Sequence, residues 1–101
     1  MTGLRIDLHP GARDDYLESL DWYLDRRVRV AQRFQEEFAN SLNRIAAHPE
    51  LAAADSEGIR WTKMEPFPHL VYYRLKDDKT IQVLAVAHTR RRPGYWRNRA
   101  K

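Results

Sequence analysis

The stretch TIQVLAVAHTRRRPGYWRNR, residues Thr80 to Arg99, decides how this chain folds, because its two halves have opposite character. Residues 81 to 87 are almost continuously apolar and rich in β-branched side chains. Such a run is typical of a strand that is buried on both faces, so we expect a central strand here. From His88 onward the chain carries five arginines, one lysine and no acidic residue. The strand therefore ends in a basic surface segment that also contains Tyr95 and Trp96.

This basic segment differs in charge from the rest of the chain. Residues 1 to 87 carry 12 basic and 14 acidic side chains, whereas residues 88 to 101 carry six basic side chains and none that is acidic. Such a concentration favours an anionic partner, either a nucleic acid or an acidic protein surface, and a solvated terminus is the alternative. Because Pro93 stiffens the chain and Trp96 can anchor it, we expect residues 93 to 99 to fold back as a turn or short helix, with Trp96 against the sheet or a helix edge.

Length and composition indicate one globular domain over residues 1 to 101. A chain of 101 residues that is 43% hydrophobic and 32% charged can build a modest core and is not disordered. The absence of cysteine excludes disulfides and thiolate metal sites. No apolar run approaches the roughly 20 residues that span a bilayer, and the first ten residues lack the pattern of a signal peptide. We therefore expect a cytoplasmic protein with no membrane partner.

The first half of the chain predicts a strand followed by a helical hairpin. Apolar residues alternate with polar ones over residues 4 to 8, which is the period of a strand. Pro10 suits the first position of a helix that reaches about Arg26. Apolar residues recur at helical spacing in this helix: Tyr16, Leu17, Leu20, Tyr23 and Leu24. Asp14, Asp15 and Glu18 lie early in the helix, where the positive end of its dipole favours them.

A second helix is predicted from about Val30 to the pair His48-Pro49, since the residue before a proline avoids the helical conformation. Its apolar stripe is clear: Ala31, Phe34, Phe38, Leu42 and Ile45. The link near residues 25 to 29 is short, so the two helices should be antiparallel. Trp22 falls off the stripe of the first helix and is either on a second buried face or partly exposed.

The second half predicts three strands. Residues 59 to 64 alternate, residues 69 to 76 are rich in strand formers, and the tight turn 77 to 79 joins that strand to the central one as a hairpin. The order is β-α-α-β-β-β. We therefore expect an α+β fold in which the helical hairpin packs on one face of a mainly antiparallel four-stranded sheet.

Few residues have a pattern that points to chemistry. There is no glycine-rich phosphate loop, and the four histidines lack the spacing of metal ligands, so we expect neither a cofactor nor a metal. His88, Arg90, Arg91 and Tyr95 form a constellation in which a histidine could move protons, arginines could hold a phosphate and a tyrosine could stack or relay a proton. The alternative is structural: His88 ends the strand, while the aromatic residues pack the tail on the sheet.

Five segments, taken in order, resemble one known family. They are WY at residues 22 to 23, A-x-x-F-x-x-x-F at 31 to 38, L-x-x-I-x-x-x-P at 42 to 49, FPHLVYYRL at 67 to 75, and VLAVAHTRRRPGYWRNR at 83 to 99. No single segment is specific, but their order and spacing resemble the RelE/ParE superfamily of bacterial toxins from type II toxin–antitoxin systems, and the ParE-like branch most closely. That superfamily has the β-α-α-β-β-β order predicted above.

The resemblance implies a small cytoplasmic toxin of a plasmid-stabilisation or stress-response module, neutralised by a cognate antitoxin that is ParD-like or similar. RelE-like members cut mRNA in the ribosome, using basic residues and often a C-terminal tyrosine or histidine. ParE-like members have no catalytic site and inhibit DNA gyrase. The partner beyond the antitoxin is therefore DNA gyrase in one interpretation, and the ribosome with its mRNA in the other.

Two positions favour the ParE-like interpretation. Where RelE-like nucleases place arginines on the third strand and just after the last strand, this chain has Leu70 and Thr89. A metal-independent ribonuclease needs several fixed cations to stabilise the charge of its transition state, so the loss of two favours a gyrase inhibitor that is not an enzyme. Arg90 and Arg91 could replace them by a small shift. The alternative is then a metal-independent endoribonuclease whose catalytic residues are His88, Arg90, Arg91 and Tyr95.

Two binding surfaces follow as hypotheses. The target-binding surface would lie in the basic segment: Arg90, Arg91, Arg92, Tyr95 and Trp96. The antitoxin-binding surface would lie along the helical hairpin, where a two-helix layer leaves apolar side chains incompletely covered: Trp22, Val28 and Val30. An amphipathic helix with an extended piece is the form of partner that such a surface suits.

Overall fold

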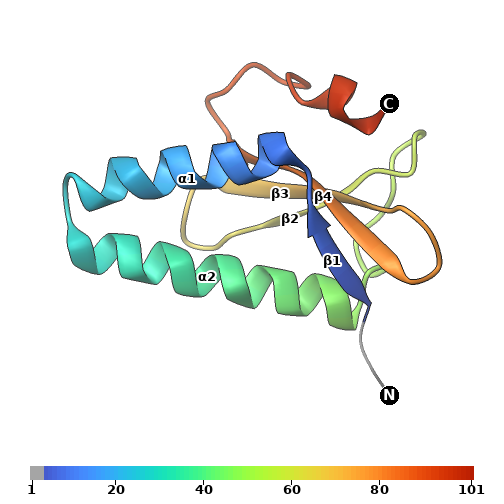
Figure 1. Cartoon of the computed structure of the whole chain (residues 1–101), viewed down its shortest axis with the longest axis horizontal. Helices are drawn as coiled ribbons and strands as arrows, with labels where there is room; N and C mark the ends of the chain where they lie inside the picture. The colour runs from blue at the N-terminus through green and yellow to red at the C-terminus, as the bar shows by residue number, and fades with distance from the viewer. Residues whose placement is uncertain (1–3) are drawn as a thin grey trace.

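The computed structural model describes residues 4 to 101 (Figure 1). Its elements run in the predicted order, with a short helix at the end of the chain. They are β1 (Arg5–Leu8), α1 (Pro10–Leu24), α2 (Val28–Ala47), β2 (Arg60–Lys63), β3 (His69–Leu75), β4 (Thr80–His88) and the 3₁₀-helix η1 (Arg97–Ala100). The predicted α+β class is confirmed.

The four strands form a single mixed sheet in the order β1-β4-β3-β2. β1 runs parallel to β4, while β3 runs antiparallel to both β4 and β2. β4 therefore has a neighbour on each side, as its apolar sequence predicts. The hairpin between β3 and β4 closes through the predicted turn, where the Lys76 amide donates a hydrogen bond of 2.9 Å to the carbonyl of Thr80.

The helical hairpin covers one face of the sheet, and α1 and α2 run antiparallel along it (Figure 1). α1 begins at Pro10 because His9 caps it: Nδ1 of His9 accepts a hydrogen bond of 2.9 Å from the Gly11 amide. α2 begins at Val28, two residues before the predicted start, so Val28 and Val30 lie in its first turn and not in a link. It ends at Ala47, directly before His48-Pro49, as predicted.

Aromatic and aliphatic side chains fill the space between the helices and the sheet. The stripe of α2 is buried or half-buried as predicted, and Phe34 is fully buried against Tyr16, Tyr23 and Phe67. From the stripe of α1, Leu20 is buried but Leu17 and Leu24 are exposed. α1 therefore faces the core along a narrower line than its periodicity indicates.

The C-terminal segment covers the opposite face of the sheet. Trp96 is only 2% exposed and packs in a second apolar cluster with Ile59, Leu84, Ala85 and Ala87. Its ring lies 4.3 Å from the ring of Tyr72 on β3, measured between centroids. The predicted folding back of residues 93 to 99 is confirmed, and Trp96 packs on the sheet.

A β-bulge in β4 sets the direction of the side chains that follow it. Tyr72 pairs with Ala85 and Tyr73 pairs with Val83, so Leu84 has no partner in β3. Before the bulge the odd-numbered residues of β4 face the helices, and after it the even-numbered ones do, as the two apolar clusters show. Bulges re-aim side chains in this way. As a result His88 lies opposite His69 on the helical side of the sheet.

Candidate functional site

Asp15 of α1 holds the C-terminal segment in place. Its carboxylate is 6% exposed and accepts hydrogen bonds from the Tyr95 hydroxyl at 3.1 Å and from Nη1 of Arg99 at 2.8 Å. We call Asp15, Tyr95 and Arg99 the tail latch. Asp15 lies beyond the first turn of α1, where the helix dipole has little effect, and its side chain points into the protein and pairs with Tyr95 and Arg99.

The tail latch also completes the edge of β4. β1 is short, and its pairing with β4 ends at Leu8 and Val83. Beyond that point the Val86 amide donates to Oδ2 of Asp15 at 3.1 Å, and the Leu84 carbonyl accepts from Nη1 of Arg99 at 3.0 Å. Buried backbone groups need such partners. Two side chains thus provide the hydrogen bonds that a longer β1 would have made.

Further contacts fix the rest of the segment. Arg74 donates to the Ala100 carbonyl at 2.6 Å, and Arg97 forms ion pairs with Asp55 and Glu57 in the loop before β2. With Arg99 in the tail latch and Arg91 at 4.0 Å from Asp15, three of the five arginines in the basic segment are engaged within the chain.

The tail latch changes the properties of Tyr95. Burial, together with the negative charge of Asp15 that accepts its hydrogen bond, raises the pKa of Tyr95 from 10.0 to about 12. The guanidinium of Arg91 stacks on its ring at 3.9 Å. The Tyr95 hydroxyl is thus held as a hydrogen-bond donor and is poorly suited to exchange a proton near neutral pH.

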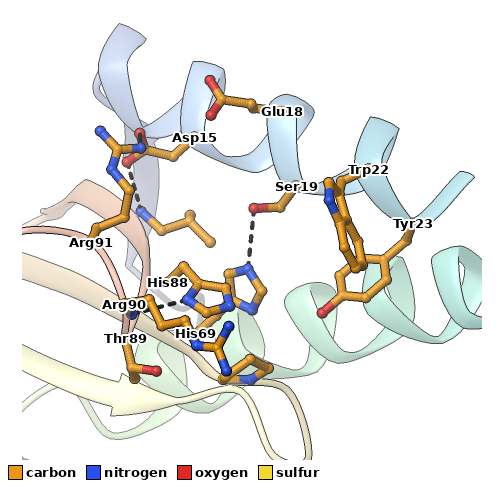
Figure 2. Close-up of a pocket in the computed structure, with 12 residues that line it drawn as sticks. Asp15, Glu18, Ser19, Trp22, Tyr23, His69, His88, Thr89, Arg90 and Arg91 are labelled. Atoms are coloured by element: carbon orange, nitrogen blue, oxygen red, sulfur yellow. Dashed lines mark hydrogen bonds and ion pairs between the residues drawn. The ribbon is translucent and has the colours of Figure 1, made fainter. Parts of the chain in front are cut away.

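A groove of about 790 Å³ lies between α1 and the ends of β3 and β4. Figure 2 shows Trp22 and Tyr23 at one end of it, Arg90 and Arg91 towards the other, and the rings of His69 and His88 between them. Its remaining lining residues are Asp15, Glu18, Ser19, Pro68, Val86 and Thr89. Trp22 is 53% exposed; the Arg26 guanidinium lies 3.8 Å from the centroid of its ring, and the rest of the indole is accessible to a partner.

The two histidines of the groove differ in their surroundings. His69 is buried, and its Nε2 lies 3.1 Å from the hydroxyl of Ser19. Burial, followed by the charges of His88 and Lys63, lowers the pKa of His69 from 6.5 to about 4. His88 is half-buried, and its Nδ1 accepts a hydrogen bond of 3.0 Å from the Arg90 amide. His69 is therefore neutral at physiological pH. It can position neighbouring side chains such as Ser19, but it is poorly suited to take up a proton.

The structure brings together residues from both predicted binding surfaces. Trp22, predicted for the antitoxin, shares the groove with Arg90 and Arg91, predicted for the target. Val28 and Val30 do not reach this groove; they line a separate hollow at the start of α2.

The other predicted residues lie outside the groove. Arg92 is exposed beside it, while Trp96 is buried beneath the tail and offers no surface to a partner in this conformation. Of the residues named for the nuclease alternative, His88, Arg90 and Arg91 line the groove, but the Tyr95 hydroxyl is directed to Asp15. Sequence reasoning did not name Asp15 or Arg99 as site residues, since neither residue type at its position signals a pairing between the two ends of the chain.

Two findings about the described residues bear on other kinds of site. Within residues 4 to 101, no three His, Asp or Glu side chains come close enough to hold a metal ion. In the same part of the chain, neither helix combines the length and the apolar character that crossing a membrane requires.

Two helices on a mixed four-stranded sheet, with a groove beside the last strand, define a small α+β domain. Residues 6–93 match the family described as the ParE toxin of the type II toxin–antitoxin system parDE, and the chain belongs to this family. The predicted resemblance is confirmed. The match ends at Pro93, so Tyr95, Trp96 and Arg99 lie beyond it.

Relatives agree with this assignment. Toxin ParE1 from Mycobacterium tuberculosis, in strains CDC 1551 / Oshkosh and ATCC 25618 / H37Rv, is 33% identical over 89 residues, which cover 85% of this chain and 90% of the relative. A solved structure described as the chromosomal ParDE TA system from P. aeruginosa is similar, with a TM-score of 0.61 and 19% identity over 84% of this chain and 95% of that one. At this identity the likeness supports the fold alone.

Proposed function

We propose that this chain is the toxin of a type II toxin–antitoxin module in the cytoplasm, that it acts by binding and inhibiting DNA gyrase, and that a ParD-like antitoxin neutralises it. Membership of the ParE family supports the toxin role. One observation carries the choice of target: the Tyr95 hydroxyl, which a nuclease would need, donates to Asp15 and has a pKa raised to about 12.

The surroundings of Leu70 and Thr89 agree with this choice. Leu70 lies in β3 opposite Ala87, and Thr89 follows β4, so neither position offers a cation. Arg90 and Arg91 lie beside His88, but Arg91 stacks on Tyr95 and lies 4.0 Å from Asp15. A phosphate bound there would have to compete with this carboxylate.

The arrangement of the same groove supports the proposed neutralisation. Trp22 stands at one end of it and Arg90 and Arg91 towards the other. A partner segment that covers Trp22 and follows the groove would cover the two arginines as well. The antitoxin would thus block target binding directly. We call residues 88 to 91, which carry Arg90 and Arg91, the arginine turn. Tyr95, on whose ring Arg91 stacks, and Trp96, which packs on the sheet, would support it. The exposed Val28 would extend the antitoxin surface along the hairpin.

The test compares two activities of the purified chain: accumulation of cleaved DNA by gyrase on supercoiled plasmid, and cleavage of mRNA on translating ribosomes. We expect the first and not the second. Tyr95→Phe should keep the first activity, because its hydroxyl has only a structural role. Tyr73→Phe is the matched control, since the Tyr73 hydroxyl also donates an internal hydrogen bond, to the Pro49 carbonyl at 2.9 Å, but far from the groove.

Ribosome-dependent mRNA cleavage that Tyr95→Phe abolishes and Tyr73→Phe preserves would reverse the assignment. The chain would then be an mRNA endonuclease that uses His88, Arg90, Arg91 and Tyr95.

A further inference from the structure

The basic end of the groove is a preformed cluster of hydrogen-bond donors. The bulge at Leu84 turns His88 towards the helices, and the turn that follows is fixed by its backbone. The Thr89 amide donates to the Pro68 carbonyl at 2.9 Å, and the Arg91 amide donates to the His88 carbonyl at 2.9 Å. Arg90 and Arg91 therefore start from a rigid turn, so a ligand that they bind need not order the backbone first.

Two donors of this cluster, Nε2 of His88 and the guanidinium of Arg90, are left free by the contacts around them. Because Nδ1 of His88 accepts from the Arg90 amide, a neutral His88 ring carries its hydrogen on Nε2. Among residues 4 to 101 the Arg90 guanidinium is in no ion pair. A ring N–H and a guanidinium that line the same groove can together donate to the two oxygens of a carboxylate or a phosphate.

The remaining lining of the groove distinguishes these two ligands. Glu18 and Asp15 lie on the wall contributed by α1, so a phosphodiester chain along the groove would pass acidic side chains. A single carboxylate bound by His88 and Arg90 needs no contact with Arg91, which is the arginine that lies 4.0 Å from Asp15. Beyond the histidines, the exposed Trp22 offers an aromatic surface to an apolar side chain of the same ligand. An acidic residue followed by an apolar one is a feature of a peptide and not of a nucleic acid.

We propose that His88 and Arg90 form a carboxylate-binding subsite, which receives an aspartate or glutamate side chain of the antitoxin while an apolar side chain of the same segment covers Trp22. This inference rests on the proposed neutralisation by an antitoxin, but not on the identity of the target. The subsite adds a charged anchor to the apolar contact at Trp22, and it would allow one segment to mask the arginines.

The first experiment examines the subsite without any protein partner. The free toxin is titrated with acetate, and NMR follows the ring protons of His88 and the Nε–H signals of the arginines; acetamide is the uncharged control of the same shape. We expect saturable shifts at His88 and Arg90 with acetate and none with acetamide. Equal shifts with both probes, or displacement of acetate by a short single-stranded oligonucleotide but not by the antitoxin, would overturn the assignment.

The second experiment measures the affinity of the cognate antitoxin. Arg90→Gln removes a charge from the subsite, while Arg13→Gln removes one from an exposed position on α1 outside the groove. We expect Arg90→Gln to raise Kd by about tenfold or more, as for a charge pair in an interface, and Arg13→Gln by less than about twofold. Equal effects of the two variants would refute the subsite. A tenfold loss in a toxin that leaves gyrase unaffected would support the subsite and reject only the proposed target.

Discussion

The helix-covered face of the sheet is packed almost entirely by apolar and aromatic side chains, whereas the tail-covered face combines a small apolar cluster with hydrogen-bonded charges. On the first face Phe34 packs against several aromatic rings. On the second, Trp96 stacks on Tyr72, and the segment is held by the tail latch. Burial of a large apolar surface stabilises the first face, and a few specific long-range contacts hold the second.

The two faces therefore have different roles: the helix-covered face contributes mainly to stability, and the tail-covered face borders the residues proposed for function. The helix-covered face can lose little without unfolding, because its side chains share one core. The tail-covered face borders the turn that carries Arg90 and Arg91, and Tyr95 and Asp15 contact Arg91 there. Variants on the two faces should therefore differ in how much they lower the free energy of unfolding, and in whether the loss of structure is global or local.

Phe34→Ala should have the largest effect. Phe34 is fully buried, and its removal would leave a cavity among Tyr16, Tyr23 and Phe67. We expect the free energy of unfolding to fall by about 3–5 kcal/mol, measured by chemical denaturation. Leu51→Ala, at a largely exposed position, should change it by no more than about 0.5 kcal/mol. A loss of about 1 kcal/mol at Phe34 would mean that this face is not the main source of stability.

Trp96→Ala should cost somewhat less, about 3 kcal/mol, because the indole is buried on one side of a small cluster. Its effect should also be local. In hydrogen exchange, we expect protection to fall first in the C-terminal segment and β2 while α2 remains protected. Trp61→Ala, which alters a half-exposed tryptophan on β2, is the matched control. Uniform loss of protection throughout the sheet would show that the two faces unfold as one unit.

The helix-covered face could be predicted from the sequence because its signals are local. The stripe of α2 and the turn before β4 depend on spacing within a few residues, and both are confirmed. The tail latch could not be predicted in this way. Asp15 and Arg99 lie 84 positions apart, and an acidic residue early in a helix has an ordinary explanation in the helix dipole.

The β-bulge in β4 is a second feature that could not be predicted from the sequence. Residues 83 to 87 are all apolar, so the alternation that would reveal an inserted residue is absent. Without the bulge, His88 would be expected on the same face as Trp96, apart from His69. The groove was therefore predicted only as two unrelated surfaces, one at Trp22 and one at the arginines.

Acid should weaken the helix-covered face through His69. In the unfolded chain this ring takes up a proton near its ordinary pKa of 6.5, but in the folded protein it does so only near pH 4. Between these values the unfolded state binds more protons, so stability falls as the pH drops from 6.5 to about 4 and this contribution is constant below that. We expect a loss of about 2 kcal/mol, since the shift sets a ceiling of roughly 3 kcal/mol. His69→Gln should flatten this part of the pH profile in denaturation measurements; an unchanged slope would assign the effect to other groups.

Gly11→Ala should have the smallest effect, because two opposing terms nearly cancel. Alanine stabilises a helix by up to about 1 kcal/mol relative to glycine. A Cβ atom at Gly11, however, would lie 2.5 Å from Nε and 2.6 Å from Cζ of Arg99, so the guanidinium would have to leave the position from which it reaches Asp15. Hydrogen bonds to charged groups contribute about 1.5–3 kcal/mol, and part of this is recovered because Arg99 can turn to solvent. We therefore expect a net change within about 0.5 kcal/mol in the wild-type chain.

In an Arg99→Ala background the clash is absent, and the same substitution should stabilise by about 0.5–1 kcal/mol, which a double-mutant cycle of denaturation midpoints resolves. If Gly11→Ala has the same effect in both backgrounds, Arg99 does not lie against α1, and the latch cannot be what holds the tail-covered face.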